Sequence, residues 1–383
     1  MAGSLAACGS TGQVSSSSTT STVANHVHAV VQLGQPGQIL LGTHYGLRES
    51  MNGGKTWSYD PGLGHIMVAA LVKLTNGYVA SLQPMGDMSG SSSMGSGSAG
   101  SSSSSTTMAA TASTQAAGSM GGMSMSGTSM GSSSGSGSSA NIYQEASPNI
   151  PYIEVSSDGQ TWQPASGVPS QALIGYLTAG PNHETAWAAV LGSGIYHSKM
   201  GGTTWKLAIP YNGIVTGLSV GVGAPNQVLI STKQGLFATT TTATALPAKP
   251  VLAENVESLH RWYACSSCLV ASLTNGGVAV SRDGGLTWSR VGSLLQFDTV
   301  VSFPSTGAAL FGMIATAGSS YVGVYRSTDG GNVWSRVLNQ QLVDQMSEVD
   351  MPGMQPYLLA YQWGITVWKS TNEGQSWTKL GRV

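Results

Sequence analysis

The chain has 383 residues, of which only 8% are charged, and its formal net charge at pH 7 is −1. This length would suggest two or three domains, but Gly, Ser and Thr are so abundant that part of the chain cannot belong to a packed core. The absence of any basic or acidic run disfavours nucleic acid and anionic membrane surfaces as partners.

The N-terminal segment 1–24 is predicted to be a flexible tether. Its residues 5–10, LAACGS, resemble the bacterial lipobox, in which a cysteine after small residues carries a lipid. This resemblance implies lipidation of Cys8, and the following Ser/Thr run, 15–22, is typical of a linker. Because no apolar run is long enough to span a bilayer, we expect an extracytoplasmic protein held at the bacterial membrane by lipid only.

Six copies of a short motif recur along the rest of the chain. They are SMNGGKTW (50–57), SSDGQTW (156–162), SKMGGTTW (198–205), SRDGGLTW (281–288), STDGGNVW (327–334) and STNEGQSW (370–377). Their tryptophans are 43 residues apart from Trp162 to Trp205, 46 from Trp288 to Trp334 and 43 from Trp334 to Trp377. The gap of 83 residues from Trp205 to Trp288 leaves room for a further unit that has lost its motif, around 229–242.

The motif resembles the Asp-box, or BNR, repeat of β-propellers. Each unit also carries four short apolar stretches, which is typical of a propeller blade. We therefore predict an all-β fold over 25–383, a seven-bladed β-propeller of four-stranded antiparallel blades with the motifs on hairpin turns. Glycines suit a tight turn and Asp or Asn bonds to its backbone N–H groups, so the motifs are predicted to be structural. Blades one and seven should then meet by side-chain packing, without a shared strand.

Proteins with this repeat include sialidases, sortilin-type receptors, xyloglucan hydrolases and photosystem II assembly factors, so the resemblance does not choose a function. Resemblance to the sialidases would imply an arginine triad that binds the substrate carboxylate and a Phe/Tyr-Arg-Ile-Pro motif. This sequence lacks that motif, and only Arg261 and Arg382 lie away from the repeats. A glycoside hydrolase that needs two carboxylates stays open as an alternative, with four candidates near the starts of blades five to seven. They are Glu257, Asp298, Asp344 and Glu348.

Four of the seven histidines are predicted to gather on the face opposite the motifs. His26 and His28 open the first strand of blade one and, being two residues apart, point to the same side of it. His44 falls at the second-to-third turn of blade one, and His65 on the link into blade two, followed by Met67. We therefore expect a histidine cluster at the junction of blades one and two.

A low-complexity insertion, 85–149, is predicted to interrupt blade two between its second strand (77–84) and its third (150–159). It has too little apolar surface to fold alone, so we expect it to be disordered. It leaves the propeller on the same face as the histidines and carries eight of the 16 methionines. These are Met85, Met88, Met94, Met108, Met120, Met123, Met125 and Met130.

Thioether sulfur favours Cu(I) and needs no deprotonation, and the M-x-x-M and M-x-M spacings let two or three sulfurs reach one ion. We therefore predict a non-catalytic, monomeric binding protein that captures copper or silver. The predicted ligands are His26, His28, His44, His65, Met67, Met85, Met88, Met120, Met123, Met125 and Met130. The open alternatives are a passive linker, a scaffold that binds a protein, and a protein that binds or hydrolyses a glycan.

Cys265 and Cys268 form the short motif CSSC. A C-x-x-C can be redox-active or half of a zinc site, but no second Cys/His pair lies nearby. The motif falls at the first-to-second turn of blade five, on the face of the repeated motifs. In an oxidising location the two cysteines are predicted to form a structural disulfide.

Overall fold

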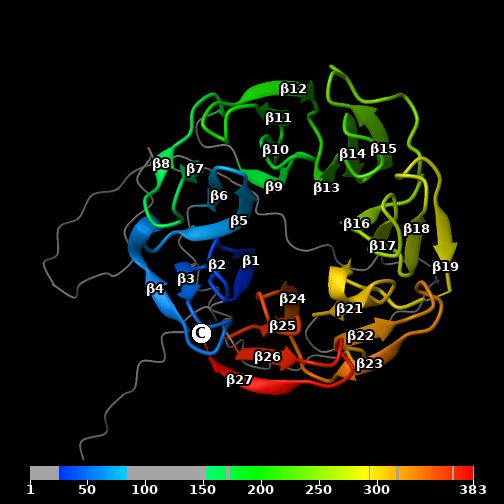
Figure 1. Ribbon diagram of the computed structural model, residues 1–383. Coiled ribbons are helices and arrows are strands. Elements are labelled where there is room, and N and C mark those ends of the chain that lie inside the picture. The colour runs from blue at the N-terminus through cyan, green and yellow to red at the C-terminus, as the bar shows by residue number, and fades with distance from the viewer. Residues whose placement is uncertain are drawn as a thin grey trace, which may run out of the picture. The chain divides into compact units, whose positions relative to one another are not determined.

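The computed structural model describes residues 26–83, 152–169, 173–292, 294–315, 319–364 and 366–382. These residues form seven antiparallel sheets arranged around a central axis (Figure 1). The first strand of each sheet lies next to the axis and the last lies at the rim, so each sheet is a propeller blade. The predicted seven-bladed β-propeller is confirmed.

Blades one to three have four strands each. Blade one contains β1 (Val27–Gln32), β2 (Ile39–Thr43), β3 (Gly46–Ser50) and β4 (Ser58–Asp60), followed by the 3-10 turn η1 (Pro61–Leu63). Blade two contains β5 (Met67–Leu74), β6 (Gly77–Gln83), β7 (Ile153–Ser156) and β8 (Gln163–Pro164). Blade three contains β9 (Ile174–Ala179), β10 (Ala186–Val190), β11 (Gly194–Ser198) and β12 (Lys206–Pro210).

Blade four has three strands, and blades five to seven again have four. Blade four contains β13 (Val215–Val220), β14 (Gln227–Thr232) and β15 (Gly235–Thr240). Blade five contains β16 (Val256–Arg261), β17 (Leu269–Leu273), β18 (Val278–Ser281) and β19 (Ser289–Val291). Blade six contains β20 (Thr299–Val301), β21 (Leu310–Ile314), β22 (Gly323–Ser327) and β23 (Ser335–Leu338), with η2 (Pro304–Thr306). Blade seven contains β24 (Val343–Val349), β25 (Tyr357–Gln362), β26 (Thr366–Ser370) and β27 (Thr378–Arg382).

Blade four departs from the predicted four strands where its motif is missing. The Leu236 N–H donates to the Leu252 carbonyl at 2.9 Å, and Val251 N–H donates to the Leu236 carbonyl at 2.7 Å. This single bridge covers the edge of β15. Pro247 and Pro250 precede it, and each lacks the N–H that would donate to β15 if the pairing continued toward them.

The core of the propeller lies between the blades. In the described part of the chain, seven clusters of buried apolar side chains each join two neighbouring blades. The second strands, such as β10 and β21, are buried along their whole length because a neighbouring blade covers each face. Their short continuous apolar runs are the sequence signature of that burial.

The ring closes by packing between blades seven and one, as predicted. Ile39 and Leu41 of blade one are buried against Leu359 and Tyr361 of blade seven. The Tyr357 hydroxyl donates to the Gly53 carbonyl at 2.7 Å across the same seam. No strand is shared, because β1 to β4 and β24 to β27 form separate sheets.

The repeated motifs form the turns between the third and fourth strands. In blade five, Ser281 Oγ donates to Asp283 Oδ1 at 2.8 Å and accepts from the Gly285 N–H at 2.8 Å. The Trp288 indole N–H donates to the Gly285 carbonyl at 3.0 Å, which locks the tryptophan under the turn. Hydrogen bonds, the strongest from the Thr287 hydroxyl, lower the pKa of Asp283 to about 2. These carboxylates are therefore engaged within their own turns and are structural.

Ring closure gives a first prediction for stability. Leu41→Ala removes a fully buried side chain from the seam and should lower the free energy of unfolding by about 2–5 kcal/mol. Leu207→Ala, at an exposed position on β12, is the matched control and should change it by less than about 0.5 kcal/mol. Urea unfolding followed by tryptophan fluorescence measures both, and equal midpoints would contradict a closure that depends on packing.

Candidate metal centre

The start of the innermost strand carries the same irregularity around the ring. In blade one the pairing of β1 with β2 shifts between Val27 and Ala29, which leaves His28 as an extra, bulged residue. A bulge re-aims the side chain that it carries. Blades two, three, four, five and seven have the same shift, and the bulged residues there are Ala69, Gly175, Thr216, Glu257 and Asp344.

In blade six the equivalent residue is Asp298. Its N–H donates to the Met313 carbonyl at 3.0 Å, and Met313 is also the partner of Thr299. The spacing supports this equivalence, since Gly175, Thr216, Glu257 and Asp298 follow one another at intervals of 41 residues. The fold therefore presents one bulged position per blade beside the axis.

Two further positions lie next to each bulge. One is the residue before the innermost strand, and the other is the first residue after the second strand. A backbone hydrogen bond joins them in blade five (Thr274 N–H to Asn255 O, 3.0 Å) and blade seven (Trp363 N–H to Leu342 O, 3.0 Å). The corresponding residues of blade one are His26 and His44. Blade one thus has histidine at all three positions.

The three imidazoles converge. One ring nitrogen from each of His26, His28 and His44 lies within 4.8 Å of the other two. The ring centroids are 4.0 Å apart for His26 and His44, 4.2 Å for His26 and His28, and 4.6 Å for His28 and His44. A tetrahedral ion with M–N bonds of 2.0–2.1 Å separates its ligand nitrogens by roughly 3.3 Å, so small ring rotations would complete the site.

Burial favours the neutral form of two of these rings, which is the form that binds metal. The pKa of His28 is lowered to about 3, first by burial and then by His26 and His44. Burial also lowers the pKa of His44. The Nε2 atom of His28 and the Nδ1 atom of His44 are buried without a hydrogen-bond partner among the described residues. An unpaired buried nitrogen is costly, and coordination of an ion would satisfy both atoms.

An aromatic side chain of blade seven completes the cluster. The Trp363 indole stacks on the His26 ring with a centroid distance of 4.5 Å and an angle of 5° between the planes. The cluster therefore adjoins the seam between blades seven and one. The prediction of a cluster at the junction of blades one and two did not include this contact with blade seven.

His65 does not belong to the group of three. Its ring stacks on Tyr59 of β4, with centroids 4.7 Å apart and planes at 9°. The link into blade two begins at the outermost strand of blade one, so its first residues lie near the rim. Met67 is the first residue of β5 in blade two, where it pairs with Gln83 of β6.

The remaining predicted ligands lie outside the described residues. These are Met85, Met88, Met120, Met123, Met125 and Met130, and the predicted lipidation site Cys8 is also outside. The predicted strands on both sides of the insertion are present as β6 and β7. Because the β6–β7 and β2–β3 connections are equivalent, the chain leaves blade two on the face that carries His44.

Three of the four candidate carboxylates accept hydrogen bonds from other residues of the propeller. Glu257 accepts from the Thr274 hydroxyl at 3.2 Å, and Asp298 Oδ2 accepts from the Ala315 N–H at 2.6 Å, so each is bonded to a turn of its own blade. Glu348 Oε1 accepts from the Ser305 N–H at 2.9 Å. Asp344 holds the bulged position on β24.

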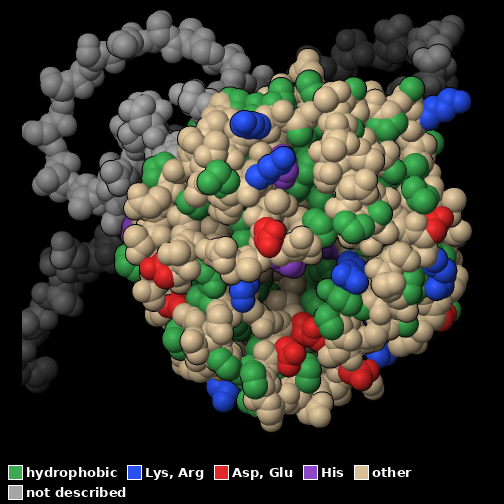
Figure 2. All heavy atoms as spheres, turned by 45° about the horizontal axis from the view of Figure 1, so that its top comes forward, with side chains coloured by type: hydrophobic (Ala, Val, Ile, Leu, Met, Phe, Trp, Pro, Cys, Tyr) green, Lys and Arg blue, Asp and Glu red, His purple; other side chains and the backbone are tan. Residues whose placement is uncertain are grey.

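Polar side chains also face the axis. Figure 2 shows acidic and histidine side chains beside the hollow at the centre of one face. Burial, followed by the nearby Glu257, raises the pKa of Tyr176 to about 12. His260 Nε2 lies 3.2 Å from the Thr299 hydroxyl. Sequence patterns alone had singled out neither residue, because only the bulge register shows which side chains face the axis.

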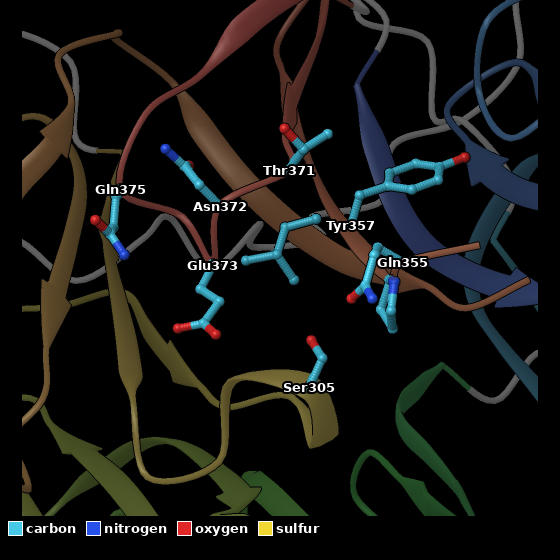
Figure 3. Close-up of a pocket in the computed structure, with 9 residues that line it drawn as sticks. Ser305, Gln355, Tyr357, Thr371, Asn372, Glu373 and Gln375 are labelled. Carbon is cyan, nitrogen blue, oxygen red and sulfur yellow. The ribbon is translucent and has the colours of Figure 1, made fainter.

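A separate pocket of about 230 Å³ lies on the face of the repeated turns, beside Ser305 of blade six and Tyr357 of blade seven (Figure 3). Glu373 is the charged residue of its lining, and that carboxylate pairs with Arg326 at 3.5 Å. The lining therefore offers no free acid–base pair. It is formed by Ser305, Gln355, Pro356, Tyr357, Leu358, Thr371, Asn372, Glu373 and Gln375.

Cys265 and Cys268 are joined by a disulfide with an S–S distance of 2.16 Å. They lie in the turn between β16 and β17. The Gly284 N–H donates to the Ser267 carbonyl at 2.9 Å, which ties the disulfide loop to the repeated turn of blade five. The described residues contain no helix that could cross a membrane.

Comparison with solved structures shows the propeller fold. The chain is similar to YCF48 from Cyanidioschyzon merolae, with 13% identity, a TM-score of 0.52 and coverage of 91% of this chain and 92% of that one. It is similar to YCF48 bound to a D1 peptide, with 14% identity, a TM-score of 0.53 and coverage of 89% and 91%. It also resembles an ancestral GH74 enzyme, with 12% identity and a TM-score of 0.57, covering 93% of this chain but 46% of the enzyme. No family model matches the sequence, and no curated protein matches it.

The lowered pKa of His28 gives a prediction for stability against pH. Below the ordinary pKa of 6.5 the unfolded chain takes up a proton that folded His28 takes up only near pH 3, so acid favours unfolding. Between pH 7 and pH 5, wild type should lose about 2 kcal/mol more stability than His28→Gln, which cannot titrate.

Urea unfolding in the presence of a chelator at the two pH values measures this difference. His65→Gln is the matched control and should keep the pH dependence of wild type, because His65 stacks on Tyr59 outside the cluster. An equal pH dependence for His28→Gln and wild type would show that His28 does not resist protonation.

Proposed function

We propose that this protein is a β-propeller of the Asp-box type that binds a soft metal ion, copper or silver, at His26, His28 and His44. The observation that carries the proposal is the convergence of three ring nitrogens within 4.8 Å of one another. The neutral state of two of these rings and their unpaired buried nitrogens support it.

The donor set narrows the choice of metal. Three imidazoles without a carboxylate suit copper and zinc better than magnesium or calcium, which prefer oxygen ligands. The methionine-rich insertion supports copper or silver over zinc, since thioethers bind soft monovalent ions. We propose that its sulfurs collect the ion on the face where the chain leaves blade two and that the histidines form the fixed site.

Lipidation of Cys8 belongs to the same proposal. A lipid would place the propeller outside the cytoplasm, where copper and silver reach a cell first. Mass spectrometry of the chain from its native membrane tests this, and an unmodified Cys8 there would contradict it.

Histidine-selective nitrogen-15 NMR of the full chain tests the metal site. Residues 84–151 contain no histidine, so the ring signals report the cluster even while methionines bind the same ion. Adding Ag(I) should shift the ring signals of His26, His28 and His44, and leave that of His65 unchanged.

A double variant makes the test quantitative. His28→Gln with His44→Gln should weaken Ag(I) binding at the remaining ring by at least about 100-fold, because two of three donors are gone. His65→Gln is the control and should bind like wild type. If Ag(I) does not shift the histidine ring signals of the wild type, the proposal is wrong.

A scaffold that binds a protein is the second candidate. Three apolar side chains are exposed on the histidine face of blades three and four, Leu173 (42%), Leu191 (49%) and Ile214 (44%). One of the similar structures is YCF48 bound to a D1 peptide, so this fold can take a peptide. Cross-linking in cells tests this candidate by comparing the wild type with a double variant, Leu173→Glu and Leu191→Glu. A partner protein that cross-links to the wild type but not to the double variant supports the scaffold function.

A further inference from the structure

The stack of Trp363 on His26 differs from the other contacts of the cluster. The His26–His44 and His28–His44 ring pairs meet nearly edge to face, at 86° and 84°. The indole is instead parallel to the His26 ring, at 5°. It comes from the opposite end of the chain and is brought there by ring closure.

A parallel indole limits where other ligands of a bound ion can lie. An ion coordinated by a ring nitrogen lies in the plane of that imidazole, about 2 Å from the nitrogen. The indole plane is parallel to the His26 plane. An ion bound to His26 would therefore be as far from the indole plane as the His26 ring is. The indole therefore covers one face of the His26 ring and limits the approach of water from that side.

The backbone holds the indole in this place. The Trp363 N–H donates to the Leu342 carbonyl at 3.0 Å, so the turn is tied to the start of β24. Trp363 is 39% exposed. Moving the indole away would break the stack without opening the core.

We propose that Trp363 determines metal specificity: by closing one side of the histidine site, it restricts a bound ion to low coordination and so selects Cu(I) or Ag(I) over Zn(II). This inference rests on the proposed metal site. Monovalent soft ions accept three ligands, whereas Zn(II) takes a fourth, usually water in an open site. The electron-rich indole face also attracts a cation that has lost its water.

Competition between Ag(I) and Zn(II) on the full chain tests the role of Trp363. Trp363→Leu keeps an apolar side chain but removes the aromatic face, whereas Trp363→Phe keeps a ring that can stack. Tyr321→Leu is the matched control, because Tyr321 is an exposed aromatic residue between the second and third strands of blade six. The nitrogen-15 signals of the histidine rings report which ion occupies the site.

Trp363→Leu should reduce the preference for Ag(I) over Zn(II) at least about 10-fold, while Trp363→Phe and Tyr321→Leu stay within about 3-fold of wild type. Near-ultraviolet absorbance should show an indole perturbation when Ag(I) binds to wild type, and that perturbation should be missing in Trp363→Phe. A merely structural tryptophan would give neither result.

Two other outcomes separate the claims. If the rings bind Ag(I) but Trp363→Leu keeps the preference of wild type, the specificity role is wrong and the metal site stands. If the rings of wild type do not respond to Ag(I), the metal site and this inference fail together.

Discussion

Burial of blade faces between neighbours is the constraint on which the rest of this structure depends. A single four-stranded blade cannot cover its own two apolar faces, so each blade is stable only between two others. Leu41 and Leu359, which pack across the closing seam, are residues of the first and last blades. The same closure brings Trp363 against His26, so the aromatic contact of the candidate site exists only in the complete ring.

The bulge at the start of each innermost strand places one side chain of each blade beside the axis. Three backbone positions recur in the blades, and the residue types at those positions decide what each blade does. In blade five, Glu257 and Thr274 occupy two of them and bond to each other. In blade one, histidines occupy all three, and two of their nitrogens have no partner in the described part of the chain. The backbone is the same in both, and only the second arrangement leaves donors for a ligand.

The fold alone does not separate the possible roles. Solved structures with this fold include YCF48 bound to a D1 peptide and an ancestral GH74 enzyme, at 14% and 12% identity to this chain. Function therefore has to be argued from the site. Glu257 and Asp298, two of the carboxylates that a hydrolase could use, are bonded within their own blades, whereas the imidazoles converge with an aromatic ring beside them.

The sequence by itself determined the number of blades and the repeated turns, and it placed the insertion between the second and third strands of blade two. It could do so because a turn such as Ser281–Trp288 is stabilised by bonds among residues within a few positions of one another. The sequence also predicted that His26, His28 and His44 lie on one face, since strand alternation and turn position are local properties. Only the tertiary structure excluded His65, added Trp363 and left blade four with three strands. The contact of Trp363 with His26 joins residues more than 300 positions apart, which no local pattern encodes.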